Sequence, residues 1–475
     1  MITRRSFFHF IVAILIACCC RVDWTFGQEN ARPNFLFIVT DDQRWDAMSC
    51  VQKEQGERAR FPWFTTPNMD RLAREGMRFR NAFVVNSLCS PSRSCFLTGR
   101  YSHMNGVANN RTPFPADSVT HATVLHNAGY VTGYFGKWHH GTQPERPGFD
   151  QFASFIGQGK YVDCPVNING TITPSEGWID DVTTDHAIRF LRENKDKSFD
   201  MVVGYKSPHD PRMPPERAKD RFAGKELRPA PNLEVAPPYH HRQATKANAR
   251  KGNGEGIRNY FRCISAADDC LGRLLDALDE LKLSDNTVVV FTSDNGYFLG
   301  EHSLGDKRGA YEESMRIPLI VRYPKLIKPG SVRDEMVLNI DLAPTIIDLA
   351  GLEARPSMPG ATWRGLFSEP RTARVWRTSF FYEYFYEKPF ATPTLTAVRT
   401  ETAKIIKYPG HDDWTEVYDL KNDPYELKNL ARDAGQAELV KQLEQLHKSL
   451  AQQAQYQTPS GLDPQPADFD QPAKP

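Results

Sequence analysis

The chain has 475 residues, and its 59 Lys and Arg nearly balance its 58 Asp and Glu, for a formal net charge of +1. This balance argues against a general nucleic-acid-binding protein, which has a basic excess or stripe, and against a disordered polyelectrolyte. No apolar run reaches about 18 residues, so we expect no transmembrane segment in the mature chain. The length is sufficient to bury a sizeable hydrophobic core.

The N-terminal segment has the pattern of an export signal. Two arginines precede an apolar run over 7–20, and small residues follow at 25–27, which predicts a signal peptide over 1–27. Residues 3–8 also resemble a twin-arginine signal, and the residues up to Cys18 resemble a bacterial lipoprotein box, which would leave a lipid there. We favour the plain secretory signal and expect an exported protein, periplasmic or secreted.

Short apolar strands alternate with amphipathic helices through most of the mature chain. A Thr66–Pro67 pair predicts the start of a helix, with Thr66 as its cap and Pro at its first position. The alternation predicts an α/β fold, with a large, mostly parallel sheet covered by helices on both faces. In chain order, the expected strands are 34–40, 130–135, 199–205, 287–291 and 317–323, and the clearest further helices are 181–193, 264–281 and 342–349.

The pattern changes after about residue 370. Four further strands predict a small antiparallel sheet, which is followed by a polar amphipathic helix over 437–453. We therefore expect a catalytic α/β domain over 32–370, a C-terminal subdomain over 371–455 and a disordered tail over 456–475. The four strands are expected over 379–386, 394–400, 404–408 and 416–420.

The stretch from Cys89 to Arg100 is the most informative part of the sequence. A cysteine alone indicates either a nucleophile or a small buried side chain. This stretch, however, reads Cys-x-Pro-Ser-Arg-x-x-x-Leu-Thr-Gly-Arg. It is similar at every specified position to the signature of type I, formylglycine-dependent sulfatases of the alkaline-phosphatase-like superfamily. The resemblance extends over about residues 32 to 455.

The resemblance implies that a formylglycine-generating enzyme oxidises Cys89 to an aldehyde, which hydrates to a geminal diol. A serine attacking a sulfate ester would be left as a stable sulfate ester itself. A diol retains a second hydroxyl, whose deprotonation expels sulfate and restores the aldehyde. The modification therefore divides one difficult step into two easier ones.

Two pairs of oxygen-bearing side chains follow predicted strands: Asp41 with Asp42, and Asp294 with Asn295. Alone, each pair is more often a loop or helix-cap feature. Together they form a hard donor set suited to Ca²⁺ or Mg²⁺. The resemblance implies one ion, Ca²⁺ ahead of Mg²⁺, bound by these four residues and by the modified Cys89.

Cationic side chains are needed around the oxygens of a sulfate ester. The resemblance implies that Arg93 anchors the formylglycine turn and that Lys137 and Lys307 neutralise charge on the sulfate. It implies that His139 is the base that releases sulfate and that His209, with Lys307, protonates the leaving group. Taken singly, each of these residues could equally be a surface cation or a structural histidine.

Other histidines near these motifs have no assigned role, with structural and substrate-contacting roles both open. They are His103, His140 and His302.

Residues 161–170 resemble the N-acetylglucosamine-6-sulfatase, or mucin-desulfating, branch of the family. The expected substrate is therefore a 6-O-sulfated hexosamine or another sulfated polysaccharide sugar, such as one from a glycosaminoglycan. One alternative is a phosphonate or phosphodiester hydrolase of the same superfamily. Another is a non-catalytic, exported glycan-binding protein that leaves Cys89 unmodified.

Overall fold

The computed structural model describes residues 32–141, 146–239, 254–354, 357–368 and 375–465. The expected signal peptide over 1–27, with Cys18, lies outside the described residues. Within them, no helix is both long and apolar enough to cross a bilayer.

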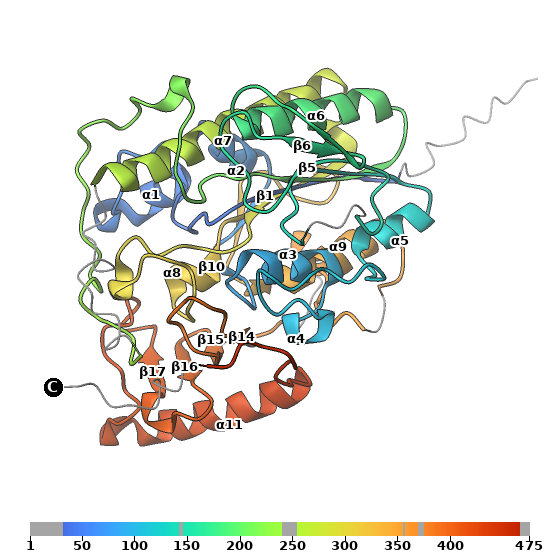
Figure 1. Cartoon of the computed structure of the whole chain (residues 1–475). Helices are drawn as coiled ribbons and strands as arrows, with labels where there is room; N and C mark the ends of the chain where they lie inside the picture. The colour runs from blue at the N-terminus through green and yellow to red at the C-terminus, as the bar shows by residue number, and fades with distance from the viewer. Residues whose placement is uncertain (1–31, 142–145, 240–253, 355–356, 369–374, 466–475) are drawn as a thin grey trace, which may run out of the picture. The chain divides into compact units, whose positions relative to one another are not determined.

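A ten-stranded mixed sheet forms the centre of the fold, in the order β12-β2-β11-β9-β1-β8-β4-β5-β6-β7 (Figure 1). Its inner strands β9, β1, β8, β4 and β5 are parallel to one another, as the sequence predicts. The outer strands differ, because β11 is antiparallel to β9 and β6 is antiparallel to β5. The strands are β1 Asn34–Thr40, β2 Met77–Phe79, β4 Val131–Lys137, β5 Gln151–Phe155, β6 Val166–Ile168, β7 Thr171–Thr173, β8 Phe199–Gly204, β9 Thr287–Ser293, β11 Leu319–Arg322 and β12 Ser331–Arg333.

The strand expected over 317–323 is in fact two strands, so that prediction was wrong. Arg316–Ile317 forms β10 and Leu319–Arg322 forms β11, with Pro318 between them. Proline has no amide hydrogen for a ladder, which favours the break at this position. The strand β10 joins a separate three-stranded sheet, β10-β3-β13, with β3 at Ala82–Phe83 and β13 at Val337–Leu338.

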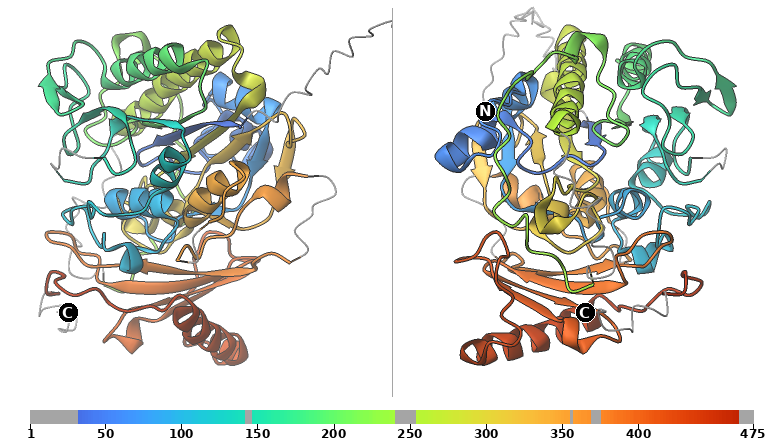
Figure 2. Two further views of the ribbon diagram at one scale, coloured as in Figure 1. Left: turned by 90° about the vertical axis from the view of Figure 1, so that its right-hand side faces the viewer. Right: turned by 60° about the vertical axis from the view of Figure 1, so that its left-hand side comes forward.

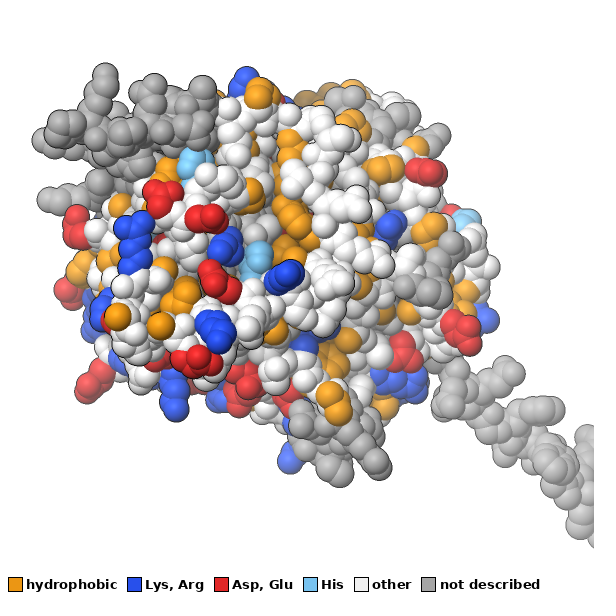
Figure 3. Space-filling view, turned by 90° about the horizontal axis from the view of Figure 1, so that it is seen from below, with side chains coloured by type: hydrophobic (Ala, Val, Ile, Leu, Met, Phe, Trp, Pro, Cys, Tyr) orange, Lys and Arg blue, Asp and Glu red, His pale blue; other side chains and the backbone are white. Residues whose placement is uncertain are grey.

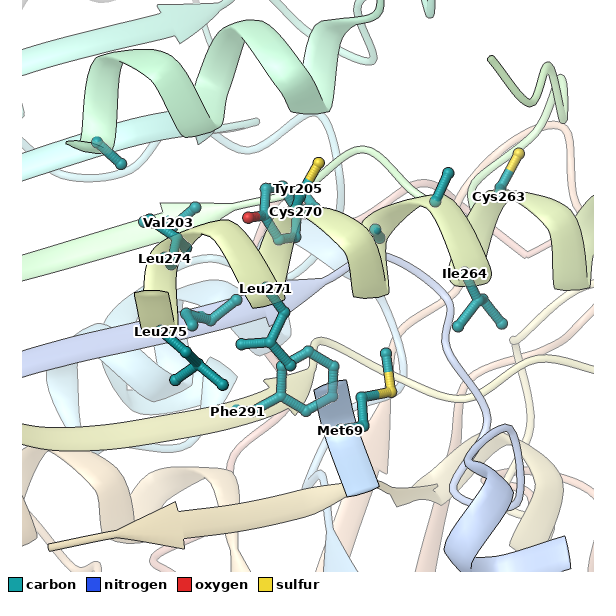
Figure 4. Close-up of a cluster of buried hydrophobic side chains, with 14 of the residues drawn as sticks. Met69, Val203, Tyr205, Cys263, Ile264, Cys270, Leu271, Leu274, Leu275 and Phe291 are labelled. Atoms are coloured by element: carbon teal, nitrogen blue, oxygen red, sulfur yellow. The ribbon is translucent and has the colours of Figure 1, made fainter. Parts of the chain in front are cut away.

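Helices cover both faces of the large sheet. In β1, Leu36 and Ile38 belong to the core formed with α2, α6 and α7, whereas Phe35 and Phe37 belong to the opposite core, formed with α3, α5 and α9. Figure 4 shows Leu271 of α7 directed toward Phe291 of β9. The helices are α1 Ser49–Gln55, α2 Pro67–Glu75, α3 Cys89–Thr98, α4 Ser102–Asn105, α5 His121–Asn127, α6 Ile179–Asn194, α7 Gly254–Glu280, α8 Glu312–Met315, α9 Leu342–Leu349, α10 Arg364–Phe367 and α11 Ala437–Gln453.

The C-terminal part is a four-stranded antiparallel sheet, β14-β15-β16-β17, with α11 packed on one face. Its other face packs on the first part of the chain, where the rings of Phe380 and Phe83 lie 5.0 Å apart and Lys404 pairs with Glu312. Figure 2 shows the sheet between α11 and the rest of the chain. Acidic and basic side chains are interspersed on the surface seen from below, without one large patch of either sign (Figure 3). The strands are β14 Ser379–Tyr384, β15 Leu395–Thr400, β16 Ala403–Lys407 and β17 Glu416–Asp419.

The structure describes residues 456–465 of the expected tail, and residues 466–475 lie outside it. The Asp463 carboxylate accepts a hydrogen bond from the Lys388 backbone N–H at 2.8 Å, and Gln465 Oε1 accepts one from the Thr394 N–H at 3.2 Å. Residues 463–465 are therefore held against the loop that joins β14 to β15.

Helix α2 begins at Pro67, as predicted, but Thr66 does not cap the N–H groups of its first turn. The Thr66 hydroxyl instead accepts a hydrogen bond from the Ser49 N–H at 2.9 Å. Asp268 of α7 accepts from the N–H groups of Asn68, at 3.0 Å, and Met69, at 2.7 Å. The cap is thus provided by a residue distant in sequence, and it fixes α2 to α7.

We expect Asp268→Ala to lower the free energy of unfolding by about 2 kcal/mol, because two amides would lose their acceptor in a buried place. The measurement is urea denaturation, with hydrogen exchange at Asn68 and Met69 as a local readout. The matched control is Asp269→Ala, which removes partly exposed ion pairs to Arg217 and Arg221 and should cost less than about 1 kcal/mol. Equal losses in the two variants would contradict a capping role.

Candidate active site

The carboxyl ends of β1 and β9 bring together the two oxygen-bearing pairs. Thr40 and Ser293 are register partners in these parallel neighbours, so the residues that follow them emerge side by side. Carboxylate oxygens of Asp41, Asp42 and Asp294 all lie within 4.8 Å of one another, and all three residues are buried.

Burial and mutual repulsion dominate the electrostatics of this cluster. Burial, reinforced by the charge of Asp41, raises the pKa of Asp294 to about 7. Burial also raises the pKa of Asp42, although Lys307 opposes the shift. Burial acts on Asp41 in the same direction, but Lys137 and other nearby cations outweigh it and hold that pKa well below its usual range. The cluster therefore favours a positive charge among its oxygens.

The fourth residue, Asn295, completes a donor set for a hard cation. Its Nδ2 donates to Asp42 Oδ1 at 2.7 Å, while its buried Oδ1 has no hydrogen-bond partner among the described residues. Three carboxylates and an unpaired amide oxygen are donors that Ca²⁺ and Mg²⁺ prefer. The residues present thus fit such an ion.

Cys89 is the first residue of α3 and is fully buried. Its Sγ lies 3.4 Å from Asp41 Oδ1. Burial and the charge of Asp41 raise the pKa of this thiol to about 12, so the unmodified side chain would remain protonated near neutral pH. A protonated thiol is a poor nucleophile, which disfavours direct attack by Cys89 itself.

Arg93, one turn further along α3, holds the Cys89 helix against the cluster. Its Nε donates to Asp294 Oδ2 at 2.9 Å, and its Nη1 donates to the Lys137 carbonyl at 2.7 Å. This buried ion pair links α3, the end of β4 and the residue after β9.

Two buried lysines contact different aspartates of the cluster. The Lys137 ammonium pairs with Asp41 and also donates to Gln158 Oε1 at 2.7 Å. The Lys307 ammonium donates to Asp42 Oδ2 at 2.9 Å. Gln158 was not among the predicted site residues, since a single glutamine in a loop carries no sequence signal.

His139 and His209 are both held as neutral bases by their surroundings. Burial, with the charge of Lys137, lowers the pKa of His139 well below its usual value, and its buried Nδ1 has no partner among the described residues. Burial likewise lowers the pKa of His209. Its Nδ1 donates to the Asp210 carbonyl at 2.6 Å, and its Nε2 lies 3.9 Å from Asp42 Oδ2.

The unassigned histidines have partners in the structure. The His140 Nδ1 lies 2.8 Å from the hydroxyl of Ser90, which donates to the His139 carbonyl at 2.6 Å. His140 therefore supports the segment next to Cys89. His103 pairs with Glu383 of β14 at 2.6 Å, outside the cluster, and His302 is discussed below.

A cavity of about 550 Å³ opens above the cluster. Asp42, His209 and Lys307 line the cavity, so a ligand there can reach these three predicted site residues. The loop that joins β14 to β15 contributes another wall, which means that the C-terminal part helps to shape the site. Further lining residues are Arg111, Gln158, Arg308, Glu387, Lys388 and Phe390.

Comparison with known proteins identifies the family. The sulfatase family model matches residues 33–352, and the model of the N-sulphoglucosamine sulphohydrolase C-terminal region matches residues 300–455. A relative from Bacteroides thetaiotaomicron, described as N-acetylglucosamine-6-O-sulfatase, is 34% identical over 92% of this chain and 88% of its own length.

Solved structures agree with this comparison. One, a complex with its substrate D-glucosamine-2-N,6-O-disulfate, has a TM-score of 0.79 and 33% identity, and the match covers 89% of this chain and 98% of that chain. The phosphonate monoester hydrolase of Agrobacterium radiobacter has a TM-score of 0.73 at 23% identity, covering 89% and 96%, and shows the fold alone. The large mixed sheet with its small C-terminal sheet is the alkaline-phosphatase-like fold. The chain belongs to the sulfatase family and is a sulfuric ester hydrolase.

Proposed function

We propose that this sulfatase removes the 6-O-sulfate of a glucosamine residue, using a formylglycine made from Cys89 and a bound Ca²⁺. The observation that carries the proposal is the convergence of Asp41, Asp42, Asp294 and Asn295 on the buried Cys89. The substrate class is supported by the relative and by the substrate complex named above. Export from the cytoplasm remains a proposal based on the N-terminal pattern.

The modified Cys89 would supply a hydroxyl nucleophile, and the Ca²⁺ would act as a Lewis acid on a sulfate oxygen. The chain's own cations perform the remaining electrostatic work. Lys137 and Lys307 already lie against the aspartates, so their ammonium groups are placed to bind sulfate oxygens as charge develops. Arg93 keeps α3, and thus position 89, fixed relative to Asp294.

The two histidines divide the proton transfers. His139, neutral and with a free ring nitrogen, would accept the proton whose removal lets sulfate depart. His209 lines the cavity, where it would protonate the sugar oxygen as the ester bond breaks. To do so it must take up a proton in the enzyme–substrate complex, which the negative charge of a sulfate ester favours.

Purified, formylglycine-containing protein should release sulfate from N-acetylglucosamine-6-sulfate, and Cys89→Ser should reduce kcat by at least about 10³-fold. Sulfate is measured by ion chromatography, with galactose-6-sulfate and an aryl phosphate as comparison substrates. Mass spectrometry of the peptide around position 89 reports the modification. Phosphate release without sulfate release would instead favour the phosphohydrolase alternative. Undiminished glycan binding by an inactive, unmodified chain would favour the binding-protein alternative.

His209→Ala should reduce kcat for the sugar sulfate by about 10²- to 10⁴-fold, because a sugar alkoxide is a poor leaving group without a general acid. The kcat for an aryl sulfate should fall much less, because its leaving group needs little protonation. Turnover of both substrates by both proteins provides the test, and Arg217→Ala, a substitution on the protein surface, serves as a control. Equal losses for the two substrates would exclude His209 as the general acid.

Removal of divalent cations with a chelator should abolish turnover, and added Ca²⁺ should restore it. Asn295→Ala should raise the Ca²⁺ concentration for half-maximal activity by about tenfold or more, because one oxygen ligand is lost. Calcium titration calorimetry on Cys89→Ser protein measures binding independently of turnover. Unchanged Ca²⁺ affinity in Asn295→Ala would contradict its role as a ligand.

A further inference from the structure

A second group of metal-ligating side chains lies outside the catalytic cavity. Ligand atoms of His302, Glu313 and Glu426 all lie within 4.8 Å of one another, and all three residues are buried. They come from three separate segments: the turn before Lys307, helix α8, and the turn after β17. The group therefore joins the C-terminal part to the main body.

Glu313 has an unused carboxylate oxygen. Its Oε1 accepts from Asn232 Nδ2 at 2.9 Å, but its buried Oε2 has no hydrogen-bond partner among the described residues. His302 Nε2 lies 3.8 Å from this oxygen, and no Lys or Arg of the described residues forms an ion pair with Glu313. Burial, with the charge of Glu301, raises the pKa of Glu313 to about 7. A buried carboxylate oxygen without a partner indicates a missing ligand.

The imidazole of His302 is oriented as it is in metal sites. Its Nδ1 donates to the Val235 carbonyl at 3.1 Å, which leaves the lone pair of Nε2 directed into the group. The ring stacks on Tyr311, with centroids 3.9 Å apart and 15° between planes. His302 has φ 54°, and Glu426 has φ 55°. A positive φ is uncommon for a residue that carries a side chain.

Asn232 supplies a further unused oxygen. It is completely buried, and its Oδ1 has no partner among the described residues. Its Nδ2 lies 3.0 Å from His302 Nε2, 2.9 Å from Glu313 Oε1 and 3.0 Å from the Tyr425 carbonyl. An amide has two hydrogens for these three acceptors. If the amide turned over, Oδ1 would lie among these three acceptor atoms. A cation would then be needed between them.

Glu426 is the least available ligand. Its Oε1 accepts from the Lys404 ammonium at 2.8 Å, and its Oε2 accepts from the Glu312 N–H at 3.0 Å. Each carboxylate oxygen has a second lone pair, so both contacts are compatible with one metal bond.

A cavity separate from the catalytic one borders this group on the side of Glu313. This cavity, of about 260 Å³, is lined by Asn232, Glu313 and Tyr425, together with Arg44 and Glu301. None of its lining residues lines the catalytic cavity.

We propose that His302, Glu313 and Glu426 bind a second divalent cation, with Asn232 as a further oxygen donor. One imidazole nitrogen with carboxylates favours Zn²⁺ over Ca²⁺. This ion links the C-terminal sheet to the catalytic body and takes no part in sulfate transfer.

The test uses the full-length protein, stripped with chelator, saturated with Ca²⁺ and then titrated with Zn²⁺. Elemental analysis after desalting should find about one Zn²⁺ per chain in the wild type, and Zn²⁺ should raise the midpoint of thermal unfolding. Glu313→Gln preserves shape and Oε1 but removes the charge, and it should lose most of this zinc. Cys89→Ala is the matched control, because Cys89 also lies within 4.8 Å of ligand atoms of Asp41 and His209.

Zinc retained by Cys89→Ala and lost by Glu313→Gln supports the site. No bound zinc in the wild type, or equal zinc in Glu313→Gln, overturns it. Loss of zinc from Cys89→Ala alone also overturns the proposed site, since the ion would then lie in the catalytic cluster. X-ray absorption of zinc-loaded Cys89→Ala protein examines the proposed site with all of its own ligands unchanged. It should show an oxygen and nitrogen shell at about 2.0–2.2 Å with an imidazole contribution, and a shell containing sulfur or lacking imidazole would exclude the proposed ligands.

Discussion

The active site depends on keeping three buried carboxylates together. Asp41, Asp42 and Asp294 repel one another inside the protein, where burial weakens the screening of their charges. Cations from three other elements compensate: Arg93 from α3, Lys137 from the end of β4, and Lys307 from the loop before α8. Each cation also brings its own element to the edge of the sheet. The negative charge that we propose binds Ca²⁺ thus also organises the sheet, the Cys89 helix and one side of the cavity.

The C-terminal part belongs to the active site as well as to the fold. Glu387 accepts from the Asn110 N–H at 3.1 Å and pairs with Arg308, and all three residues line the catalytic cavity. Asn110 in turn accepts from the Ser90 N–H at 2.9 Å, next to Cys89. The change of sequence pattern near residue 370 therefore marks the passage from the large sheet to the C-terminal sheet. It does not separate two parts with independent functions.

Local sequence patterns predicted much of this structure. Strand β1, helix α9 and helix α11 have the predicted bounds because apolar spacing alone specifies them. The residues after β1 and those after β9 could be placed together from the sequence, because the carboxyl ends of parallel strands lie at the same edge of a sheet. Long-range features could not be predicted. Gln158 meets Lys137 only through folding, Asp268 caps a helix about 200 residues away, and the direction of β11 depends on its neighbours.

The complete burial of Cys89 has a consequence for the order of events in biosynthesis. Cys89 begins α3, all residues of which are buried, and its side chain lies against Asp41, so no enzyme could enclose residues 89–93 in the folded chain. The proposed oxidation must therefore precede folding, while this segment is still extended. Folding and maturation then compete in time, and a chain that folds first would be stable yet permanently inactive. Conditions that slow folding should increase the fraction of active molecules.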